Sequence, residues 1–272
     1  MIRTLRFPLF LCLGLAGCMK TTKPDPLADV TGFCEAWAEQ ACNADVVSHC
    51  SAASANACVA KQQSFCETLV PASKYSEQGA LDCLDAVGKA YEDTVLTADE
   101  RDTVLHLAAP CDKVLSGPGN EGDTCTVESD CDTNTGLTCV KKSPTGKGYC
   151  YVPKIVGGGL DCSADSDVCD TGFYCSSDSH CISANTSGET CSADVPCDPG
   201  SRCLTASGAA LGSSDGGSDS GTCQARSALG EACSTDDDCA SSICAGASST
   251  AKGACSQNIV LSFTDPVCDD LR

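Results

Sequence analysis

The sequence predicts a small disulfide-rich fold, in which N-terminal disulfide-linked α-helical hairpins are followed by four short Cys-rich modules with little regular structure. Cysteine supplies 26 of the 272 residues, a share typical of scaffolds that disulfides stabilise. Aromatic residues number only 12, which is too few for one large core. The cysteine spacing changes near residue 117, and this change separates a helical domain, residues 31–116, from the modules, residues 117–255.

The charge of the chain excludes one class of partner. The 37 acidic residues outnumber the 17 basic ones and give a formal net charge of −20. Such a surface repels nucleic-acid phosphates instead of steering them toward the protein. We therefore expect no nucleic acid among the partners.

The start of the chain has the features of a bacterial lipoprotein signal. Arg3 and Arg6 precede an apolar run, residues 7–15, that is too short for a transmembrane helix. The run leads into Leu15-Ala16-Gly17-Cys18, which resembles the bacterial lipobox. The resemblance implies that residues 1–17 are removed as a signal peptide and that Cys18 receives acyl chains, palmitate among them.

This resemblance implies that residues 18–30 tether the folded chain to a membrane of the bacterial cell envelope. Several acyl chains anchor a protein stably where a single chain does not. Met19 stands where some inner-membrane lipoproteins have an Asp retention signal, and this favours the outer membrane. The alternative is a plain secretory signal that happens to end in Cys. Both alternatives export the chain to an oxidising compartment.

Processing at Cys18 leaves an even number of thiols. Cys12 is removed with the signal peptide and Cys18 takes lipid, so 24 of the 26 cysteines remain available for pairing. The loss of Arg3 and Arg6 leaves 15 basic and 37 acidic residues, a net charge of −22. The mature chain is therefore strongly acidic, and all its thiols can pair.

The first helical hairpin is predicted from cysteines that recur every eight residues. They are Cys34, Cys42, Cys50, Cys58 and Cys66. Eight residues rise about 12 Å along one helix, which is too far for neighbouring cysteines to bond. In an antiparallel hairpin, paired positions have a constant sum of residue numbers. Cys34 with Cys66 and Cys42 with Cys58 both give 100, so we expect these bridges between helices at 31–42 and 54–69, with the turn at Cys50.

A second pair of helices follows from the same rule. Thr97-Ala98-Asp99-Glu100 has the pattern of a capping box at a helix start. A turn at Thr97 predicts a bridge between Cys83 and Cys111, across helices at 77–95 and 98–109. A core-facing stripe is expected on the earlier of these helices. It comprises Leu81, Leu84, Val87, Tyr91 and Val95.

Capping residues are expected at the ends of the first two helices. Asn43 suits the C-terminal cap of the first helix. Ser51 or Ser54 suits the N-cap of the second. These polar positions bound the predicted turn on both sides.

From Gly122 onward, one cysteine pattern is repeated four times. The repeats span residues 122–150, 159–181, 188–223 and 230–255. Each begins with Gly-x-x-Cys, continues with Ser or Thr and an acid two residues later, and contains four cysteines. Four cysteines allow three connectivities. We favour first with third and second with fourth, because interlocked bridges fix a small module that has almost no apolar centre.

Two cysteines remain after these assignments, Cys50 and Cys268. By elimination we expect a long-range bridge between them, from the helical domain to the C-terminal tail, residues 256–272. The alternative is a free or intermolecular Cys50. The four modules are otherwise expected to extend as an elongated arm.

The module sequence resembles the N-terminal cysteine-rich module of Dickkopf proteins. The residues that carry this resemblance are Gly-x-x-Cys, an Asp-Cys pair and a Gly-x-Cys close, with Gly230-Glu-Ala-Cys233 and Asp238-Cys239 as the nearest segment. The resemblance covers about half the chain and implies a small secreted binding module. It does not extend to the receptors that the animal proteins bind.

The sequence offers little chemistry for catalysis. It contains no Cys-x-x-Cys, no Gly-rich phosphate loop between a strand and a helix, and no His-Glu-x-x-His. We therefore expect no catalytic residue and no cofactor. Calcium prefers flexible acidic loops, so Asp236, Asp237 and Asp238, with residues 213–220, are weak calcium candidates.

The expected function is a non-catalytic binding or structural role in the bacterial cell envelope, for a protein attached to the membrane through Cys18. Its partner is expected to be an extracellular or periplasmic protein or a polysaccharide. The alternatives are a protease inhibitor that uses disulfide-stapled loops, a calcium-dependent adhesion protein and, with less support, a hydrolase that uses carboxylates.

Overall fold

The computed structural model describes residues 25–142, 147–206, 208, 220–247 and 251–272. Within these residues the α-helices are α1 (Val30–Ala41), α2 (Ala44–His49), α3 (Ala55–Leu69), α4 (Ala80–Ala90) and α5 (Ala98–His106). Short 3-10 helices are η1 (Cys111–Val114), η2 (Glu128–Asp130), η3 (Thr133–Thr135), η4 (Asp236–Asp238) and η5 (Pro266–Asp270).

The strands are short and numerous. They are β1 (Val95–Thr97), β2 (Thr124–Cys125), β3 (Thr138–Val140), β4 (Gly148–Tyr151), β5 (Lys154–Val156), β6 (Asp167–Cys169), β7 (Phe173–Cys175), β8 (Cys181–Ser183), β9 (Thr190–Ser192), β10 (Ser201–Leu204), β11 (Ser220–Ala225), β12 (Ala232–Cys233), β13 (Cys244–Ala245), β14 (Gly253–Cys255) and β15 (Asn258–Val260). Twelve disulfides link the described cysteines. The fold is therefore disulfide-rich, with few helices and many short strands.

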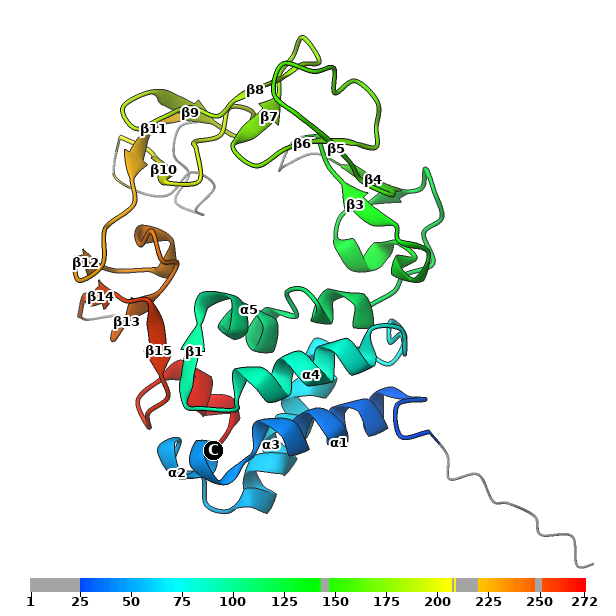
Figure 1. Ribbon diagram of the computed structural model, residues 1–272, viewed down its shortest axis with the longest axis vertical. Coiled ribbons are helices and arrows are strands. Elements are labelled where there is room, and N and C mark those ends of the chain that lie inside the picture. Colours follow the sequence, from blue (N-terminus) through cyan, green and yellow to red (C-terminus); the bar gives the residue numbers. More distant parts are fainter. Residues whose placement is uncertain (1–24, 143–146, 207, 209–219, 248–250) are drawn as a thin grey trace, which may run out of the picture.

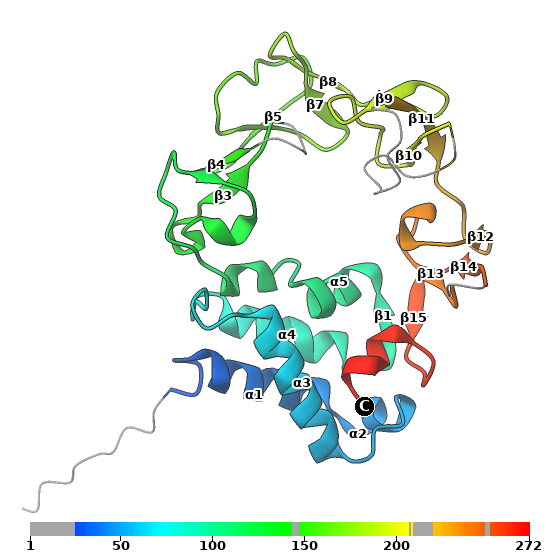
Figure 2. The ribbon, with the colours of Figure 1, turned by 180° about the vertical axis from the view of Figure 1, so that it is seen from behind.

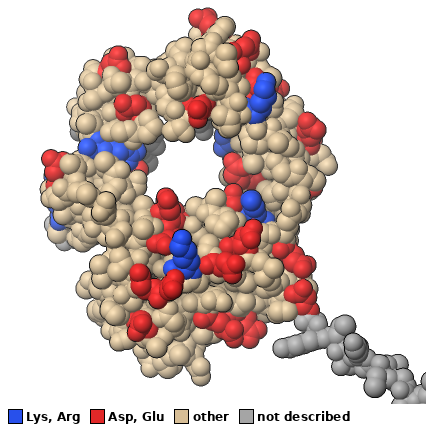
Figure 3. Space-filling model, viewed as in Figure 1, with Lys and Arg blue, Asp and Glu red and all other residues tan. Residues whose placement is uncertain are grey.

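The chain forms a closed ring. The helical unit, residues 25–116, forms one side, and modules 1 to 4 follow as an arc (Figure 1). These modules are residues 122–150, 159–181, 188–223 and 230–255. The view from behind shows the same path (Figure 2), and the space-filling view shows an opening through the middle (Figure 3). The expected elongated arm is wrong, because the tail, residues 256–272, returns to the helical unit.

Side-chain caps define where the helices begin. The side chains of Asp29 and Ser54 each accept a backbone N–H three residues ahead, at the starts of α1 and α3. Thr97 and Glu100 form the reciprocal capping box that starts α5, as the sequence predicts. The polar residues that interrupt the Ala-rich sequence therefore set the helix starts.

Asn43 has a different role from the one expected. It does not end α1; its Oδ1 accepts the Val46 N–H at 2.9 Å and starts α2, a helix inside the predicted turn. Its Nδ2 donates to the carbonyl of Tyr91. Asparagine suits both helix ends in isolation, and the contact with Tyr91, 48 residues away, stabilises the N-cap position.

The bridges of the helical unit join the pairs that the residue-number sums predict. Cys34 bonds to Cys66 and Cys42 to Cys58, between α1 and α3. Cys83 of α4 bonds to Cys111, which lies in η1 beyond the end of α5. The helix expected at 98–109 ends earlier, because Leu107 adopts the left-handed conformation with φ of 52°.

The helix expected at 77–95 is also shorter than predicted. It ends at Ala90, and Val95 belongs instead to β1, where strand pairing with the tail overrides the helical pattern. Leu84, Val87 and Tyr91 of the expected stripe are buried. Leu81 is 68% exposed, because it lies about 100° around α4 from buried Ala80.

The modules share one construction. In each, the first cysteine bonds to the third and the second to the fourth, which is the favoured connectivity. The glycine of each Gly-x-x-Cys has φ between 79° and 95°, a region that L side chains rarely adopt. Its N–H donates to the carbonyl of the closing cysteine at 2.7–2.9 Å. Glycine therefore closes each module at its entry. Modules 1, 3 and 4 contain three-stranded sheets, and module 2 contains the pair β7–β8.

The tail closes the ring through several different contacts. β15 pairs antiparallel with β1, and Leu261 N–H donates to Thr94 O at 2.8 Å. Cys268 bonds to Cys50, across 218 residues of sequence. Apolar side chains of the tail are buried in the core of the helical unit, namely Leu261, Val267 and Leu271. The predicted tail is therefore part of that core.

Candidate functional site

The region around the opening is the part of the molecule where separate units meet. α5 lies along one edge of the opening in both ribbon views (Figures 1 and 2). Two hollows meet on this helix, and His106, an exposed residue, lines both of them. The smaller, of about 430 Å³, lies between α5 and module 1 and is lined by Leu107, Val127 and Lys141 among others.

The larger hollow lies where the ring closes, and we name it the closure groove. It has a volume of about 600 Å³ and lies between α5, module 4 and the tail. Its lining includes Leu105, His106, Ala245, Val260 and Asp265. Burial raises the pKa of the Asp265 carboxyl above its ordinary value. The groove is a concave surface to which three separate parts of the chain contribute.

Three consecutive carboxylates of module 4 lie beside arginines, one at this junction and two toward module 3. Asp236 accepts from Arg101 of α5 at 2.7 Å, and its other oxygen accepts the Cys244 N–H at 2.7 Å. Asp238 pairs with Arg202 of module 3. Asp237 lies 3.8 Å from Arg226, in the segment that joins modules 3 and 4. The acidic run therefore connects module 4 to three different neighbours.

Each of the three weak calcium candidates, Asp236, Asp237 and Asp238, lies beside an arginine. A calcium site needs several oxygens that converge on one point. The three carboxylates instead turn toward three separate guanidinium groups. The other calcium candidates, residues 213–220, lie outside the described residues except for Ser220.

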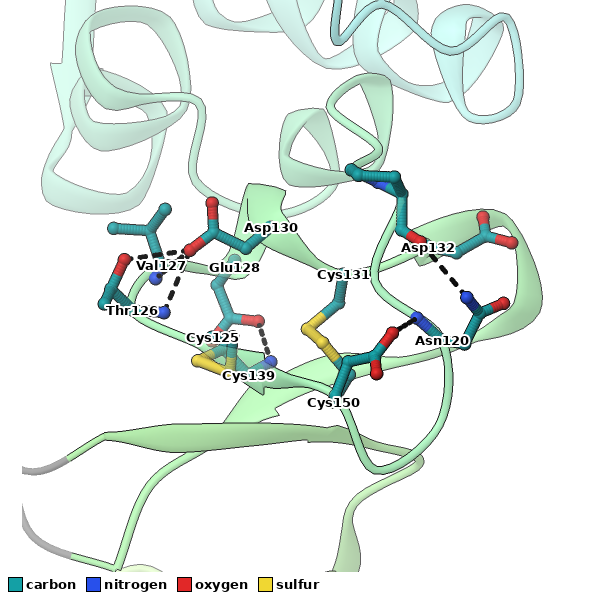
Figure 4. Close-up of a disulfide and its surroundings, with 12 residues drawn as sticks. Asn120, Cys125, Thr126, Val127, Glu128, Asp130, Cys131, Asp132, Cys139 and Cys150 are labelled. Atoms are coloured by element: carbon teal, nitrogen blue, oxygen red, sulfur yellow. Dashed lines mark hydrogen bonds between the residues drawn. A yellow bond between two sulfur atoms is a disulfide. The ribbon is translucent and has the colours of Figure 1, made fainter.

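Acids near the equivalent position have structural roles in module 1. In module 1, Glu128 accepts the N–H of the third cysteine, Cys139, as Asp236 does in module 4 (Figure 4). Asp130 accepts the N–H groups of Thr126 and Val127 at 2.9 and 3.1 Å. In modules 1 and 4, acids of the sequence motif therefore hold the chain by accepting the N–H of the third cysteine.

Asp130 also takes part in the contact between module 1 and the helical unit. Lys74 donates to Ser129 at 3.0 Å and lies 3.4 Å from Asp130. Hydrogen bonds from the Thr126 N–H, then from the Val127 N–H, hold the pKa of Asp130 well below its usual range. An equivalent pair joins Lys154 and Asp167 at the entry to module 2, at 3.4 Å.

We expect Asp130→Asn to destabilise the protein by about 1–2 kcal/mol at pH 7, because two N–H groups lose a charged acceptor. The folded pKa of Asp130 lies below the unfolded value near 4, so its contribution is complete above about pH 4. It disappears as the pH falls through the folded pKa. Denaturant titrations from pH 7 to pH 2 should therefore show the difference from the parent shrinking on acidification. Asp112→Asn, at an exposed site of the helical unit, is the control; an equal loss there, or a constant difference for Asp130→Asn, would contradict the assignment.

The cysteines are structural in the described part of the chain. Sulfur atoms of module cysteines gather in four groups, but each cysteine in them is disulfide-bonded and offers no thiolate to a metal. His49 and His180 stand beside Cys50 and Cys181 in the sequence. Both cysteines are disulfide-bonded, so neither histidine has a free thiol next to it with which to form a nucleophile pair. Cys18 and the rest of the lipobox lie outside the described residues.

Comparison with known proteins finds no relative of this chain. No family model, curated protein or solved structure matches the chain. No helix in the described part of the chain combines the length and the apolar character needed to cross a membrane. The candidate site is therefore defined by the geometry of this chain alone.

Sequence reasoning missed the arginines of the site and one glutamine, which lies in the core beneath the tail. Arg101, Arg202 and Arg226 lie 135, 36 and 11 residues from their partners in the acidic run of module 4, in no recurrent pattern. Gln62 is 1% exposed, and its side chain bonds both Trp37 and the carbonyl of Asp270. The only signal in the sequence was that 17 cations face 37 acids, so each cation has many possible partners.

Proposed function

We propose that the protein is a lipid-anchored protein of the bacterial cell envelope, held in the outer membrane, with a binding or structural role and no catalytic role. The lipobox ending at Cys18 supports the anchor, and Met19 supports the outer membrane. The closed ring supports the binding role, because twelve disulfides among the described residues fix its surface before any partner binds. A surface that is ordered in advance loses less entropy on binding.

The state of the acidic side chains supports a role without catalysis. A catalytic acid or base must reach a substrate proton within hydrogen-bond distance. In module 4, Asp236, Asp237 and Asp238 are committed to arginine partners at the ring junctions. In module 1, Glu128 and Asp130 accept backbone N–H groups. These contacts leave the hydrolase alternative fewer unpaired carboxylates in modules 1 and 4.

We further propose that the helical unit works as two disulfide-linked helical hairpins that support the modules. The bridges Cys34–Cys66 and Cys42–Cys58 between α1 and α3 support the first hairpin. The bridge Cys83–Cys111 supports the second. The Dickkopf-like motif of the modules fits the same role, since it implies a secreted binding module.

The anchor is tested by comparing the parent with Cys18→Ser in cell fractionation. We expect the parent in the outer-membrane fraction and the variant as a soluble protein of the exported compartment. Cys12→Ser, within the predicted signal peptide, is the matched control and should leave the membrane fraction unchanged. Membrane retention of Cys18→Ser would overturn the lipid anchor.

The binding role is tested with the purified mature chain and envelope extract. The native chain should retain a partner that the reduced and alkylated chain does not, because reduction removes the fixed surface. Turnover of a substrate from a broad panel, abolished by substitution of one carboxylate, would overturn the proposal of a non-catalytic role.

A further inference from the structure

The two-stranded sheet that closes the ring has one blocked edge and one open edge. On β1, the Val95 N–H donates to the side chain of Asp93 at 2.8 Å. The Thr97 N–H donates to the side chain of Glu100 at 2.9 Å. These carboxylates occupy the groups that another strand would need, so β1 cannot extend the sheet.

The edge of β15 is open at Val260. The bond from Leu261 N–H to Thr94 O fixes which residues of the antiparallel pair exchange hydrogen bonds. Because these pairs alternate, the N–H and C=O of Ile259 point toward β1 and those of Val260 point away. Within the described residues, neither backbone group of Val260 has a hydrogen-bond partner. Its side chain is also open, with 61% of the residue exposed.

The neighbouring position on the same edge is closed by the chain itself. The hydroxyl of Ser256 donates to the carbonyl of Asn258 at 2.8 Å. The Asn258 N–H lies 3.4 Å from the same hydroxyl. The unpaired part of the sheet edge is therefore short and centred on Val260.

This open edge lies along the closure groove. Val260 lines the groove with Leu105 of α5, and these two side chains supply its accessible apolar surface; Ile259 and Val267 also line it but are buried. An extended peptide beside β15 would therefore find backbone partners along its edge and apolar surface for alternate side chains. A groove of about 600 Å³ has room for several side chains.

The charged residues of the groove determine which sign of charge a bound peptide should have. Arg101 is already committed to Asp102 and Asp236, at 2.8 and 2.7 Å. The remaining carboxylate is Asp265, which accepts the Val267 N–H at 2.9 Å and lines the groove. The mature chain around it carries a net charge of −22. Basic side chains fit this surface and acidic ones are repelled.

We propose that the closure groove binds an extended polypeptide segment of alternating apolar and basic residues, which adds to β15 as a third strand through the backbone of Val260. The proposal names the partner class for the binding role proposed above and rests on that role. A polysaccharide has no peptide backbone to pair with Val260, so the two ligands predict different results.

The test uses the exported full-length chain with Cys18→Ser, purified with its disulfides intact. The probe is a labelled ten-residue peptide of alternating valine and lysine, followed by fluorescence anisotropy. We expect binding with a dissociation constant in the micromolar range. A valine–glutamate peptide should bind at least tenfold more weakly, and a valine–lysine peptide N-methylated at every residue should not bind, because methylation then removes the donors on both edges of the strand.

Two variants and one site-specific readout connect binding to β15. Val260→Pro removes an N–H that points away from β1, so it should weaken the peptide at least tenfold while the melting temperature stays close to that of the parent. Val260→Thr keeps the backbone groups and should bind within threefold of the parent. Saturating peptide should also slow hydrogen exchange of the Val260 amide.

An unchanged exchange rate at Val260, or equal binding by Val260→Pro, would show attraction to the acidic surface in general and overturn the proposal. Binding of an acidic or neutral oligosaccharide that neither peptide displaces would assign the groove to a glycan. That result would also overturn the proposal. These outcomes do not depend on lipidation, since the tested chain lacks Cys18.

Discussion

Replacement of both Cys50 and Cys268 by alanine should lower the free energy of unfolding by about 3–5 kcal/mol. This bridge spans 218 residues, the largest separation among the twelve disulfides, and long loops gain the most from closure. Both cysteines are fully buried in the core that the tail shares with the helical unit. Their loss should therefore weaken the attachment of the tail as well as the stability of the whole chain.

Hydrogen exchange at Leu261 separates these two effects. Its N–H bonds to Thr94 O only while the tail is attached, so exchange should accelerate in the double variant. Cys233→Ala with Cys244→Ala is the matched control, because it removes a bridge of separation 11 within module 4. The control should leave exchange at Leu261 slow. Equal exchange rates at Leu261 in the two variants would show that the Cys50–Cys268 bridge does not hold the tail.

The second large effect is expected at Gln62. This buried side chain accepts the indole N–H of Trp37 at 3.0 Å and donates to the carbonyl of Asp270 at 2.8 Å. Gln62→Leu has a similar size but leaves both partners without a hydrogen bond. We expect a loss of about 2–4 kcal/mol in denaturant unfolding, since each unpaired buried group costs about 1–3 kcal/mol.

Gln63→Leu provides the comparison for Gln62→Leu. Gln63 lies on the same helix, and its side chain bonds only the exposed Glu67 at 3.2 Å. Its replacement should change stability by about 0.5 kcal/mol or less. Similar losses for both variants would mean that the leucine itself disturbs α3, and that the link from Trp37 to the tail contributes little.

Most of what the sequence predicts about the fold comes from the spacing of its cysteines. The bridges Cys34–Cys66 and Cys42–Cys58 follow from a geometric rule for antiparallel segments. The module connectivity follows from the need to fix a unit without an apolar centre. Both arguments use spacing along a short stretch of chain, and both apply before any contact between distant segments is known.

The ring could not be predicted in the same way. Its closure depends on β1 and β15, which are three residues each, too short to show an alternating pattern. Val95 fits the stripe of the helix expected at 77–95 equally well, and only its partner Val260 determines that it is a strand. The Arg101–Asp236 pair joins residues 135 apart and has no local signal.

The candidate site was predicted in part. The sequence singled out Asp236, Asp237 and Asp238, and Asp236 lies at the closure of the ring. They were weak calcium candidates, because an acidic run is also the composition of a calcium loop. Their arginine partners come from other units, so the choice between a metal and an ion pair depends on tertiary structure.

Closure of the ring also fixes how many repeats the chain can contain. In an open array of repeats, each unit contacts only its neighbours, and units can be gained or lost at little cost. Here both ends of the arc attach to the same helical unit, through the segment after Cys111 at one end and through Cys268 at the other. Deleting or duplicating one module would move β15 away from β1. The repeat number is therefore set by geometry, and this protein can vary its loops but not its count of modules.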